Sequence, residues 1–356
     1  MQPKTSNILI FGGGAVGGFV ATTLCSVIPE KSVFVTCRSN YAQALKSGFI
    51  LQSDVWQKTL SARPVIVRSA QEAAEASSRP FDFVVIATKS SHAVPTISEQ
   101  ILPAVSQSTT IVVIQNGIQV EDEFRRRYPE NPILSVVTYV PVTQTEPGVF
   151  HHPPHAKVAT VHLGAYPATS PPSHHDIARS FCDLLASTGT KTIFHEDIQI
   201  ERWSKLLVNM ENPICALSRL RDAQFFNSAD GAADSLRRVM EEVASVARAA
   251  GYASIDNTVV SRSIDFLTVR HLPGVEPSTM ADALAGRTME VESLVGNVLR
   301  MAREFKVDTP RVELVYYLLN GLNASFKLNP KQAIAQSPAL PSVEHSNGNQ
   351  FVRLQS

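Results

Sequence analysis

Short apolar runs recur through the first third of the chain. With their flanking residues they lie at Ile8–Phe11, Ser32–Thr36, Phe81–Ala87 and Thr110–Ile114. Runs of this length without polar alternation are typical of strands that are buried on both faces of a parallel sheet. Weaker strand signals lie around Ile50–Leu51 and Val65–Val67, and a helix is predicted over Tyr41–Ser47. The pattern therefore predicts an α/β fold.

After residue 133 the chain turns towards alternation of apolar and polar positions. The segments that follow this pattern are Leu134–Tyr139, Val149–Phe150, Val158–Leu163 and Thr192–Phe194. We interpret them as further strands that close the first domain. The stretch Ala165–His175 is rich in Pro and Ser and predicts a surface loop, and Asp176–Ser187 is predicted to be a helix.

From Asp197 onward the pattern becomes almost entirely helical. Two sets of apolar residues each share one helical face, namely Leu236, Val239, Met240, Val243, Val246 and Ala247, and Val291, Leu294, Val295, Val298, Leu299 and Ala302. These stripes are typical of a helical core. We expect a nucleotide-binding domain over residues 1–197 and an all-helical C-terminal domain over residues 198–328. Residues 329–356 lack periodicity and are expected to form a disordered tail.

A glycine-rich turn follows the first predicted strand. It contains G-x-G-x-x-G within Gly12, Gly13, Gly14, Ala15, Val16 and Gly17, and helical spacing resumes immediately afterwards. In such a turn the first Gly permits the tight bend, the second admits a pyrophosphate and the third packs the helix on the strand. The start of the helix offers free N–H groups to an anion. Strand, turn and helix together predict a dinucleotide site.

The end of the second predicted strand indicates which dinucleotide would bind. NAD-preferring sites carry an acid about 20 residues after the glycines. Here the strand is followed by Cys37, Arg38, Ser39 and Asn40; Arg38 can pair with a 2′-phosphate, and Ser39 and Asn40 can add donors. We therefore expect NADPH. Lys89 and Asn116 follow later strands and should reach the same sheet edge, unless they are ordinary loop residues.

A polar stripe marks the first helix of the predicted C-terminal domain. Lys205, Asn209 and Asn212 lie at i, i+4 and i+7 and would share one helical face. A lysine beside two amides among apolar residues suits a small carboxylate or ketone. Burial would lower its pKa towards the range that is useful to a general acid. The alternative is a surface lysine followed by helix-terminating asparagines before Pro213.

The bulk composition argues against several other classes of protein. The 356 residues include 32 Lys and Arg against 32 Asp and Glu, so no basic bias favours nucleic acid or a membrane surface. We expect neither a membrane span nor a signal peptide. The four cysteines show no C-x-x-C pairing, and with these expectations they favour a reducing, cytoplasmic location. His151, His152, His155, His174 and His175 lack an acidic cluster, so we expect no metal.

Taken together, these motifs resemble the ketopantoate reductases (2-dehydropantoate 2-reductases) over nearly the whole chain to about residue 327. The resemblance rests on GGGAVGG, Arg38, ATK ending at Lys89 and QNG around Asn116, then on ERWSKLLVN, ENP and PSTMADALAGRTMEVE. It implies a Rossmann-type domain followed by a helical domain, with the active site in the cleft between them. It also implies that NADPH reduces the ketone of a branched 2-oxo acid, on the way to pantothenate and coenzyme A.

The resemblance also implies roles for individual residues. Lys205 would be the general acid, and Asn209 would bind substrate. Ser278 would bind the substrate carboxylate, Glu290 would contact substrate and orient the lysine, and Asn116 would lie near the nicotinamide. Glu290 is alternatively an ordinary acid at the start of a helix. The family includes more than one oligomeric state, and a homodimer is among our expectations.

One departure from the family pattern leaves the substrate open. The family's second asparagine before proline usually falls four residues after the first, whereas Asn209 and Asn212 are separated by three. The deletion would rotate Asn212 by about 100° on a regular helix, unless a kink at Pro213 absorbs it. The alternatives are a different 2-oxo acid or specialised-metabolite ketone, or a non-catalytic NADP(H)-binding regulator whose tail recruits a partner.

Overall fold

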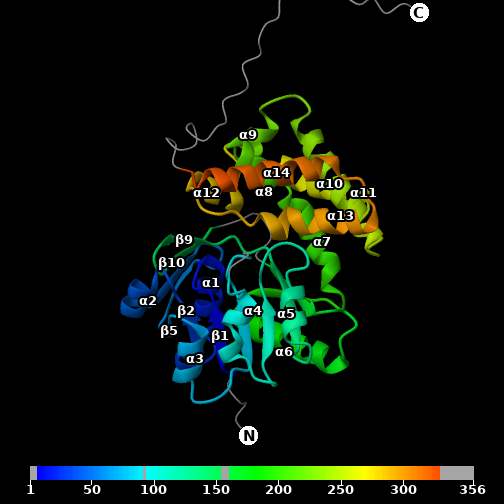
Figure 1. Cartoon of the computed structure of the whole chain (residues 1–356). Helices are drawn as coiled ribbons and strands as arrows, with labels where there is room; N and C mark the ends of the chain where they lie inside the picture. Colours follow the sequence, from blue (N-terminus) through cyan, green and yellow to red (C-terminus); the bar gives the residue numbers. More distant parts are fainter. Residues whose placement is uncertain (1–5, 91–93, 154–159, 329–356) are drawn as a thin grey trace, which may run out of the picture.

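The computed structural model describes residues 6–90, 94–153 and 160–328. A strand-rich part forms one end of the molecule and a group of helices the other, with α7 (Ile198–Asn209) leading from the first to the second (Figure 1). The main sheet has eight strands in the order β12 (Lys191–Phe194), β11 (Thr160–Ala165), β8 (Ile133–Thr138), β7 (Thr110–Val113), β6 (Phe83–Ile86), β1 (Ile8–Phe11), β2 (Val33–Thr36) and β5 (Val65–Val67). All neighbours are parallel except β8 and β11. The expected parallel sheet is confirmed.

Helices cover both faces of this sheet, so the consecutive apolar positions of its strands are buried on both sides. On one face Phe19 and Leu24 of α1 (Ala15–Leu24) and Phe181 of α6 (Pro172–Ser187) join a single core cluster. A second cluster on the other face includes α3 (Ala70–Ala76), α4 (Ile97–Gln100) and α5 (Asp122–Arg127). Short 3-10 turns lie at Glu30–Ser32 and Leu102–Ala104.

Four further strands form a second, smaller sheet rather than closing the first. Its order is β4 (Lys58–Ala62), β3 (Phe49–Ser53), β10 (Val149–His152) and β9 (Thr143–Glu146), and α2 (Tyr41–Ser47) precedes it. Phe19 of α1 contacts the rings of Trp56 and His152 here, at centroid distances of 5.7 and 5.4 Å. Val149–Phe150 is therefore confirmed as part of a strand, β10, which pairs in this second sheet. Strands β4 and β9 were not predicted because their side chains are mostly polar and exposed.

The predicted surface loop before α6 is shorter than expected. The helix begins at Pro172 instead of Asp176, because a proline at the first helical position costs no hydrogen bond. The preceding Tyr166 remains in the core cluster on the other face of the sheet. The prediction that residues 172–175 belong to the loop was wrong.

Every regular element described after Asp197 is helical. The helices are α7, α8 (Glu211–Ser218), α9 (Asp222–Phe226), α10 (Ala232–Ala249), α11 (Asn257–Thr268), α12 (Ser278–Leu284), a π-helical turn (Glu292–Gly296), α13 (Asn297–Phe305) and α14 (Pro310–Ser325). Both predicted stripes are buried in one core, with Met240, Val243 and Val298 all fully covered. We propose the domain boundary at Asp197, whose carboxylate caps α7 by accepting from the Gln199 N–H.

Two expectations concern the chain ends and membranes. Residues 329–356, which were predicted to form a disordered tail, lie outside the described residues. Across the ranges that the structure describes, none of the helices has the length and apolar character needed to span a bilayer. The four cysteines, Cys25, Cys37, Cys182 and Cys215, are free thiols.

Candidate functional site

The glycine turn between β1 and α1 is held by a close approach of helix and strand. A Cβ atom at Gly17 would lie 1.8 Å from the carbonyl oxygen of Gly12, so no larger residue fits there without moving α1. Gly12 itself has a φ of +119°, which L side chains rarely adopt. Its N–H donates to the Thr36 hydroxyl at 2.8 Å. The turn therefore requires glycine at both positions.

The N-terminus of α1 is open. Gly14 is its N-cap residue and is exposed, no side chain caps the helix, and a Cβ at Gly14 would meet no atom within 4 Å. Ala15 and Val16 then begin the helix. The first N–H groups of a helix have no intrahelical partner and carry the positive end of its dipole. This turn can accept a phosphate or pyrophosphate.

Arg38 lies exposed just beyond β2, on the edge of the sheet where α1 starts. Within the described ranges its guanidinium makes no hydrogen bond or ion pair, so it is available to an anionic ligand. Asn40, which the sequence suggested as a further donor, is buried and donates to the Gly13 carbonyl at 2.7 Å. Asn40 therefore supports the glycine turn.

Lys89 and Ser90, beyond β6, connect the strand-rich part to the helices. Lys89 pairs with the buried Asp282 of α12. The N–H and hydroxyl of Ser90 both donate to the same carboxylate oxygen of Glu290, at 2.8 and 3.3 Å. Burial raises the pKa of Glu290. Two predicted site residues, Lys89 and Glu290, thus lie on one edge of the contact between the two parts.

Asn116 lies half-buried beyond β7, in a loop that also contacts the helices. Ile118 in this loop donates to the Ser293 carbonyl at 3.1 Å and accepts from the Asn297 amide at 2.6 Å. The side-chain amide of Asn116 makes no hydrogen bond to any other described residue. It is therefore a free donor and acceptor on this edge of the sheet.

Lys205 projects from α7 towards the end of β8. Its Nζ donates to the Thr138 carbonyl at 3.0 Å and lies 4.3 Å from the centroid of the Tyr139 ring. Burial lowers the pKa of Lys205 to about 8, against the opposing effect of nearby Glu211 and Glu201. At neutral pH the ammonium group is protonated but holds its proton less tightly than an exposed lysine. This confirms the expected effect of burial.

Asn209 and Asn212 do not share one continuous helix. Helix α7 ends at Asn209, the chain turns at Met210, and α8 begins at Glu211. Pro213 then lies in the first turn of α8, where its missing N–H costs no hydrogen bond. The prediction that one continuous helix carries Lys205, Asn209 and Asn212 was therefore wrong. Both asparagines are buried, and neither amide bonds to another residue in the described part of the chain.

Ser278 begins α12 and is exposed. Like the three asparagines, its side chain makes no hydrogen bond within the described ranges. Glu290 contacts Ser90 and Lys205 contacts Thr138, and no hydrogen bond joins Glu290 to Lys205 directly. Glu290 is thus linked to Lys89 through Ser90, the next residue in the chain. Lys205, Asn116 and Ser278 each lie on a different helix or loop.

Sequence reasoning missed a buried ion-pair cluster beside Lys205. Arg270 pairs with Glu211 at 3.2 Å and with the fully buried Asp222. Burial raises the pKa of Glu211 to about 7 despite the attraction of Arg270. The signal in the sequence was Glu211 itself, an acidic residue that closely follows the apolar run Leu206–Val208. Its partner Arg270 is far away in the sequence, so the pair could not be predicted.

A second missed residue, Arg202, links α7 to the loop of Asn116. Its guanidinium is buried, pairs with Glu121 at 2.8 Å, and donates to the carbonyls of Gln115 and Gly117 at 2.8 and 2.9 Å. Gln115 and Gly117 flank Asn116 in the chain. Arg202 therefore holds the loop of Asn116 against the helix that carries Lys205.

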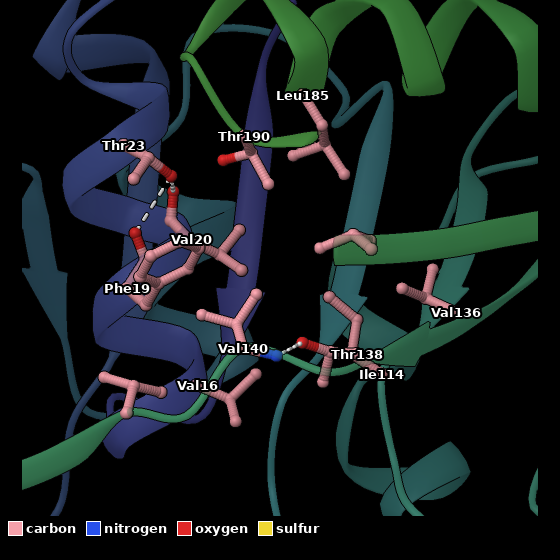
Figure 2. Close-up of a pocket in the computed structure, with 12 residues that line it drawn as sticks. Val16, Phe19, Val20, Thr23, Ile114, Val136, Thr138, Val140, Leu185 and Thr190 are labelled. Atoms are coloured by element: carbon pink, nitrogen blue, oxygen red, sulfur yellow. Dashed lines mark hydrogen bonds between the residues drawn. The ribbon is translucent and has the colours of Figure 1, made fainter. Parts of the chain in front are cut away.

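A separate pocket in the strand-rich part has a different character. Figure 2 shows it between α1 and strands of the main sheet, where Val16, Phe19, Val20 and Val140 point inward. Its lining is apolar apart from threonines such as Thr23, whose hydroxyl donates to the Phe19 carbonyl at 2.9 Å. No charged side chain lines it, so we assign it no polar ligand.

Two family models match this chain. The one described as ketopantoate reductase PanE/ApbA matches residues 8–167, and the one described as ketopantoate reductase PanE/ApbA C terminal matches residues 197–323. A 2-dehydropantoate 2-reductase from Nostoc sp. is 25% identical over 320 residues, which is 88% of this chain and 94% of that protein.

Solved structures show the same likeness. The 2-dehydropantoate 2-reductase from Methylococcus capsulatus aligns with a TM-score of 0.77 at 27% identity, over 91% of this chain and 99% of that one. A D-mandelate dehydrogenase, solved with NADH and anilino(oxo)acetate, aligns with a TM-score of 0.76 at 20% identity, over 90% and 99%, and this likeness shows the fold alone. Because the two family models together match more than half of its residues, the chain belongs to the ketopantoate reductase family.

Proposed function

We propose that this protein is an NADPH-dependent reductase of a 2-oxo acid, with 2-dehydropantoate (ketopantoate) as substrate and pantoate as product. The observation that carries the proposal is Lys205, which is half-buried, donates from its ammonium group to the Thr138 carbonyl, has a pKa lowered to about 8 by burial and lies on the same helix as the buried Asn209. Membership of the ketopantoate reductase family supports the reaction class.

The residues of the glycine turn fit NADPH. Gly12 and Gly17 allow the close turn, and the uncapped start of α1 at Gly14 leaves room for a pyrophosphate. Arg38 is exposed and suits a 2′-phosphate, and Lys89 and Asn116 stand on the same sheet edge. When bound, NADPH supplies the hydride that reduces the carbonyl carbon.

Lys205 has two tasks in this proposal. Its ammonium group stabilises the negative charge that develops on the carbonyl oxygen, and it then gives that oxygen a proton. The Thr138 carbonyl keeps the ammonium in place at 3.0 Å. Because its pKa is lowered, Lys205 gives up its proton at neutral pH more readily than an exposed lysine would.

The remaining predicted residues bind and orient the substrate. Asn209 and Asn212 contribute buried amides, Ser278 offers a hydroxyl to the substrate carboxylate, and Glu290 accepts a hydrogen bond from a substrate hydroxyl. An unpaired buried amide is costly, so these side chains favour a polar ligand that satisfies them. We also propose that the protein is a homodimer and that it lies in the cytoplasm. Measurement of its molecular mass in solution tests the dimer.

A different 2-oxo acid is the second candidate. The turn at Met210 between α7 and α8 separates Asn209 from Asn212, which supports a pocket of altered shape. A structural neighbour titled D-mandelate dehydrogenase motivates the inclusion of aromatic 2-oxo acids. The two candidates share the role of Lys205 and differ only in the group beside the ketone.

The test measures NADPH oxidation with ketopantoate and with linear, branched and aromatic 2-oxo acids, each repeated with NADH. We expect NADPH-dependent turnover that is fastest with ketopantoate. Faster turnover of another 2-oxo acid would show that this acid, and not ketopantoate, is the substrate, and would leave the proposed reaction class unchanged. Binding of NADPH without turnover of any 2-oxo acid would overturn the proposal in favour of a non-catalytic binding protein.

Replacement of the lysine tests the mechanism. Lys205→Ala should lower kcat by about a hundredfold or more, because general acid catalysis is typically worth that factor, and should leave NADPH affinity unchanged. The matched control is Lys58→Ala, since Lys58 is exposed on β4 of the second sheet. Near-normal kcat in Lys205→Ala would exclude the lysine as the proton donor.

A further inference from the structure

Three side chains from different elements converge beside α7. They are His162 on β11, His195 just after β12, and Glu201 in the first turn of α7. One ligand atom from each, two imidazole nitrogens and a carboxylate oxygen, lies within 4.8 Å of the other two. All three residues are half-buried. Within residues 6–90, 94–153 and 160–328, no other group of histidine, cysteine and acidic residues meets in this way.

The geometry is close to that of a metal site. His162 Nδ1 lies 2.8 Å from His195 Nε2 and 3.9 Å from the Glu201 Oε2 atom. Ligands at about 2.1 Å from a tetrahedral or octahedral ion stand about 3.0–3.4 Å apart. The two nitrogens would separate, and the carboxylate would approach, by less than an ångström each. Small side-chain rotations on three fixed elements supply such movements.

A neighbouring tyrosine orients the carboxylate. The Tyr139 hydroxyl donates to the other oxygen of Glu201, Oε1, at 2.6 Å, which leaves Oε2 facing His162. Hydrogen bonds of this kind fix ligand carboxylates around metal ions in proteins.

Other histidines with polar partners in the structure lack this arrangement. Among the described residues, His151 pairs with Asp54 at 2.9 Å, His175 pairs with Glu196 at 3.4 Å, and His152 bonds to the Ser53 hydroxyl at 3.1 Å. The predicted absence of a metal rested on His151, His152, His174 and His175, and on His155, which lies outside the described residues. His162 and His195 were not considered because their meeting depends on the pairing of β11 with β12.

The chemistry of the three donors selects the kind of ion. Two imidazoles and one carboxylate are a typical ligand set for Zn²⁺, with the fourth position open to water. His162 Nδ1 and His195 Nε2 share one hydrogen bond at 2.8 Å, and a bound ion would replace the proton between them. Glu201 and Tyr139 also line an open groove with Ser204 and Phe266, so solvent has access to this side of the cluster.

We propose that His162, His195 and Glu201 bind one divalent transition-metal ion of the zinc class. The site adjoins the proposed proton donor, because Glu201 precedes Lys205 by one helical turn and the Tyr139 ring contacts both the lysine and His162. The ion takes no part in the proposed hydride transfer.

Direct metal binding tests this inference independently of turnover. The full chain, without an affinity tag and after dialysis against a chelator, is titrated with Zn²⁺ by calorimetry and with Co²⁺ by visible spectroscopy. We expect one Zn²⁺ per chain, and Co²⁺ absorption bands typical of nitrogen and oxygen ligands. The absence of saturable binding would overturn the proposal, whatever the enzyme assay gives.

Variants identify the ligands. His162→Gln and His195→Gln should each weaken Zn²⁺ binding more than about a hundredfold, and Tyr139→Phe about tenfold, because loss of an outer partner costs less than loss of a ligand. His151→Gln, with its own acidic neighbour Asp54, is the matched control and should bind normally. Circular dichroism checks that each variant folds. Equal affinity in the His195→Gln variant and the wild type would show that the ion binds elsewhere.

Discussion

Two opposing effects act on the ammonium group of Lys205. Burial beside Tyr139 removes water and favours the neutral amine, whereas Glu211 and Glu201 favour the charged form. Burial is the larger effect, and the pKa falls to about 8. The group therefore combines a proton at neutral pH with a reduced hold on it, as a general acid requires.

The pKa of Lys205 predicts how the reaction depends on pH. A proton donor must be protonated, so kcat/KM for ketone reduction should be constant below about pH 7 and fall tenfold per pH unit above about pH 8. Oxidation of the hydroxy acid needs the neutral amine and should rise over the same range. Initial rates in both directions across this range measure the effect. A reduction rate that stays flat to pH 10 would contradict it.

Arg38 predicts the choice of cofactor. It is exposed beyond β2, and its guanidinium has no partner among the described residues, so a 2′-phosphate would gain a charged hydrogen bond there. Arg38→Ala should raise KM for NADPH by about tenfold or more and leave KM for NADH unchanged. Arg238→Ala, an exposed arginine on α10, is the control. An equal rise in KM for NADPH and NADH would mean that Arg38 does not recognise the 2′-phosphate.

Single residues also show how far the sequence could predict the site. Lys205 and Arg38 could be proposed as site residues because each has a local signal, a polar stripe for Lys205 and a strand end for Arg38. Glu211 and His195 were not found, because their partners Arg270 and His162 come from distant elements. Spacing along one helix carries no information about a pairing that only the tertiary fold creates.

At the scale of elements, the β1–α1 turn could be predicted in full because its chemistry is local. Strand, glycines and helix are contiguous, and the steric demands fall on Gly12 and Gly17. The break between α7 and α8 could not be located, because Pro213 permits either a kink or a new helix start. The polar strands β4 and β9 were missed because pairing with β3 and β10 forms them, not their own apolar pattern.

The two glycines of this turn should respond differently to the same added methyl group. Gly17→Ala places a Cβ 1.8 Å from the Gly12 carbonyl and should lower the free energy of unfolding by about 2 kcal/mol or more. Gly14→Ala meets no atom and has a φ of −77°, so it should leave stability unchanged and weaken NADPH binding. Urea unfolding and cofactor titration measure the two effects. Normal NADPH affinity in Gly14→Ala would argue against a pyrophosphate there.

At the scale of the whole molecule, buried charges contribute to stability as well as to chemistry. Glu211, Asp222 and Arg270 bring two acids and one base into a buried cluster where α8, α9 and the chain after α11 meet. One acid is therefore in excess. Because burial raises the pKa of Glu211 from 4.5 to about 7, its charged form is disfavoured in the folded state.

Glu211 therefore makes the stability of the fold depend on pH. Ionisation of Glu211 in the folded state lowers the free energy of unfolding. This loss is absent below about pH 4.5, the pKa of the unfolded state, grows as the pH rises, and is complete above about pH 7. Relative to wild type, Glu211→Gln should gain about 2 kcal/mol of unfolding free energy between about pH 5 and pH 8. Glu304→Gln, on exposed α13 surface, is the control. A relative loss over this range would mean that the pair with Arg270 outweighs burial.

The contacts of Arg202 have a consequence for how the site is prepared for a substrate. This one guanidinium binds both carbonyls that flank Asn116, and it lies one turn before Lys205 on α7. Ile118 in the same loop and Ser90 after the neighbouring strand both bind Ser293, so this edge of the sheet is attached to the helices at several points. The spacing between the Asn116 amide and the proposed proton donor is therefore set before a substrate arrives.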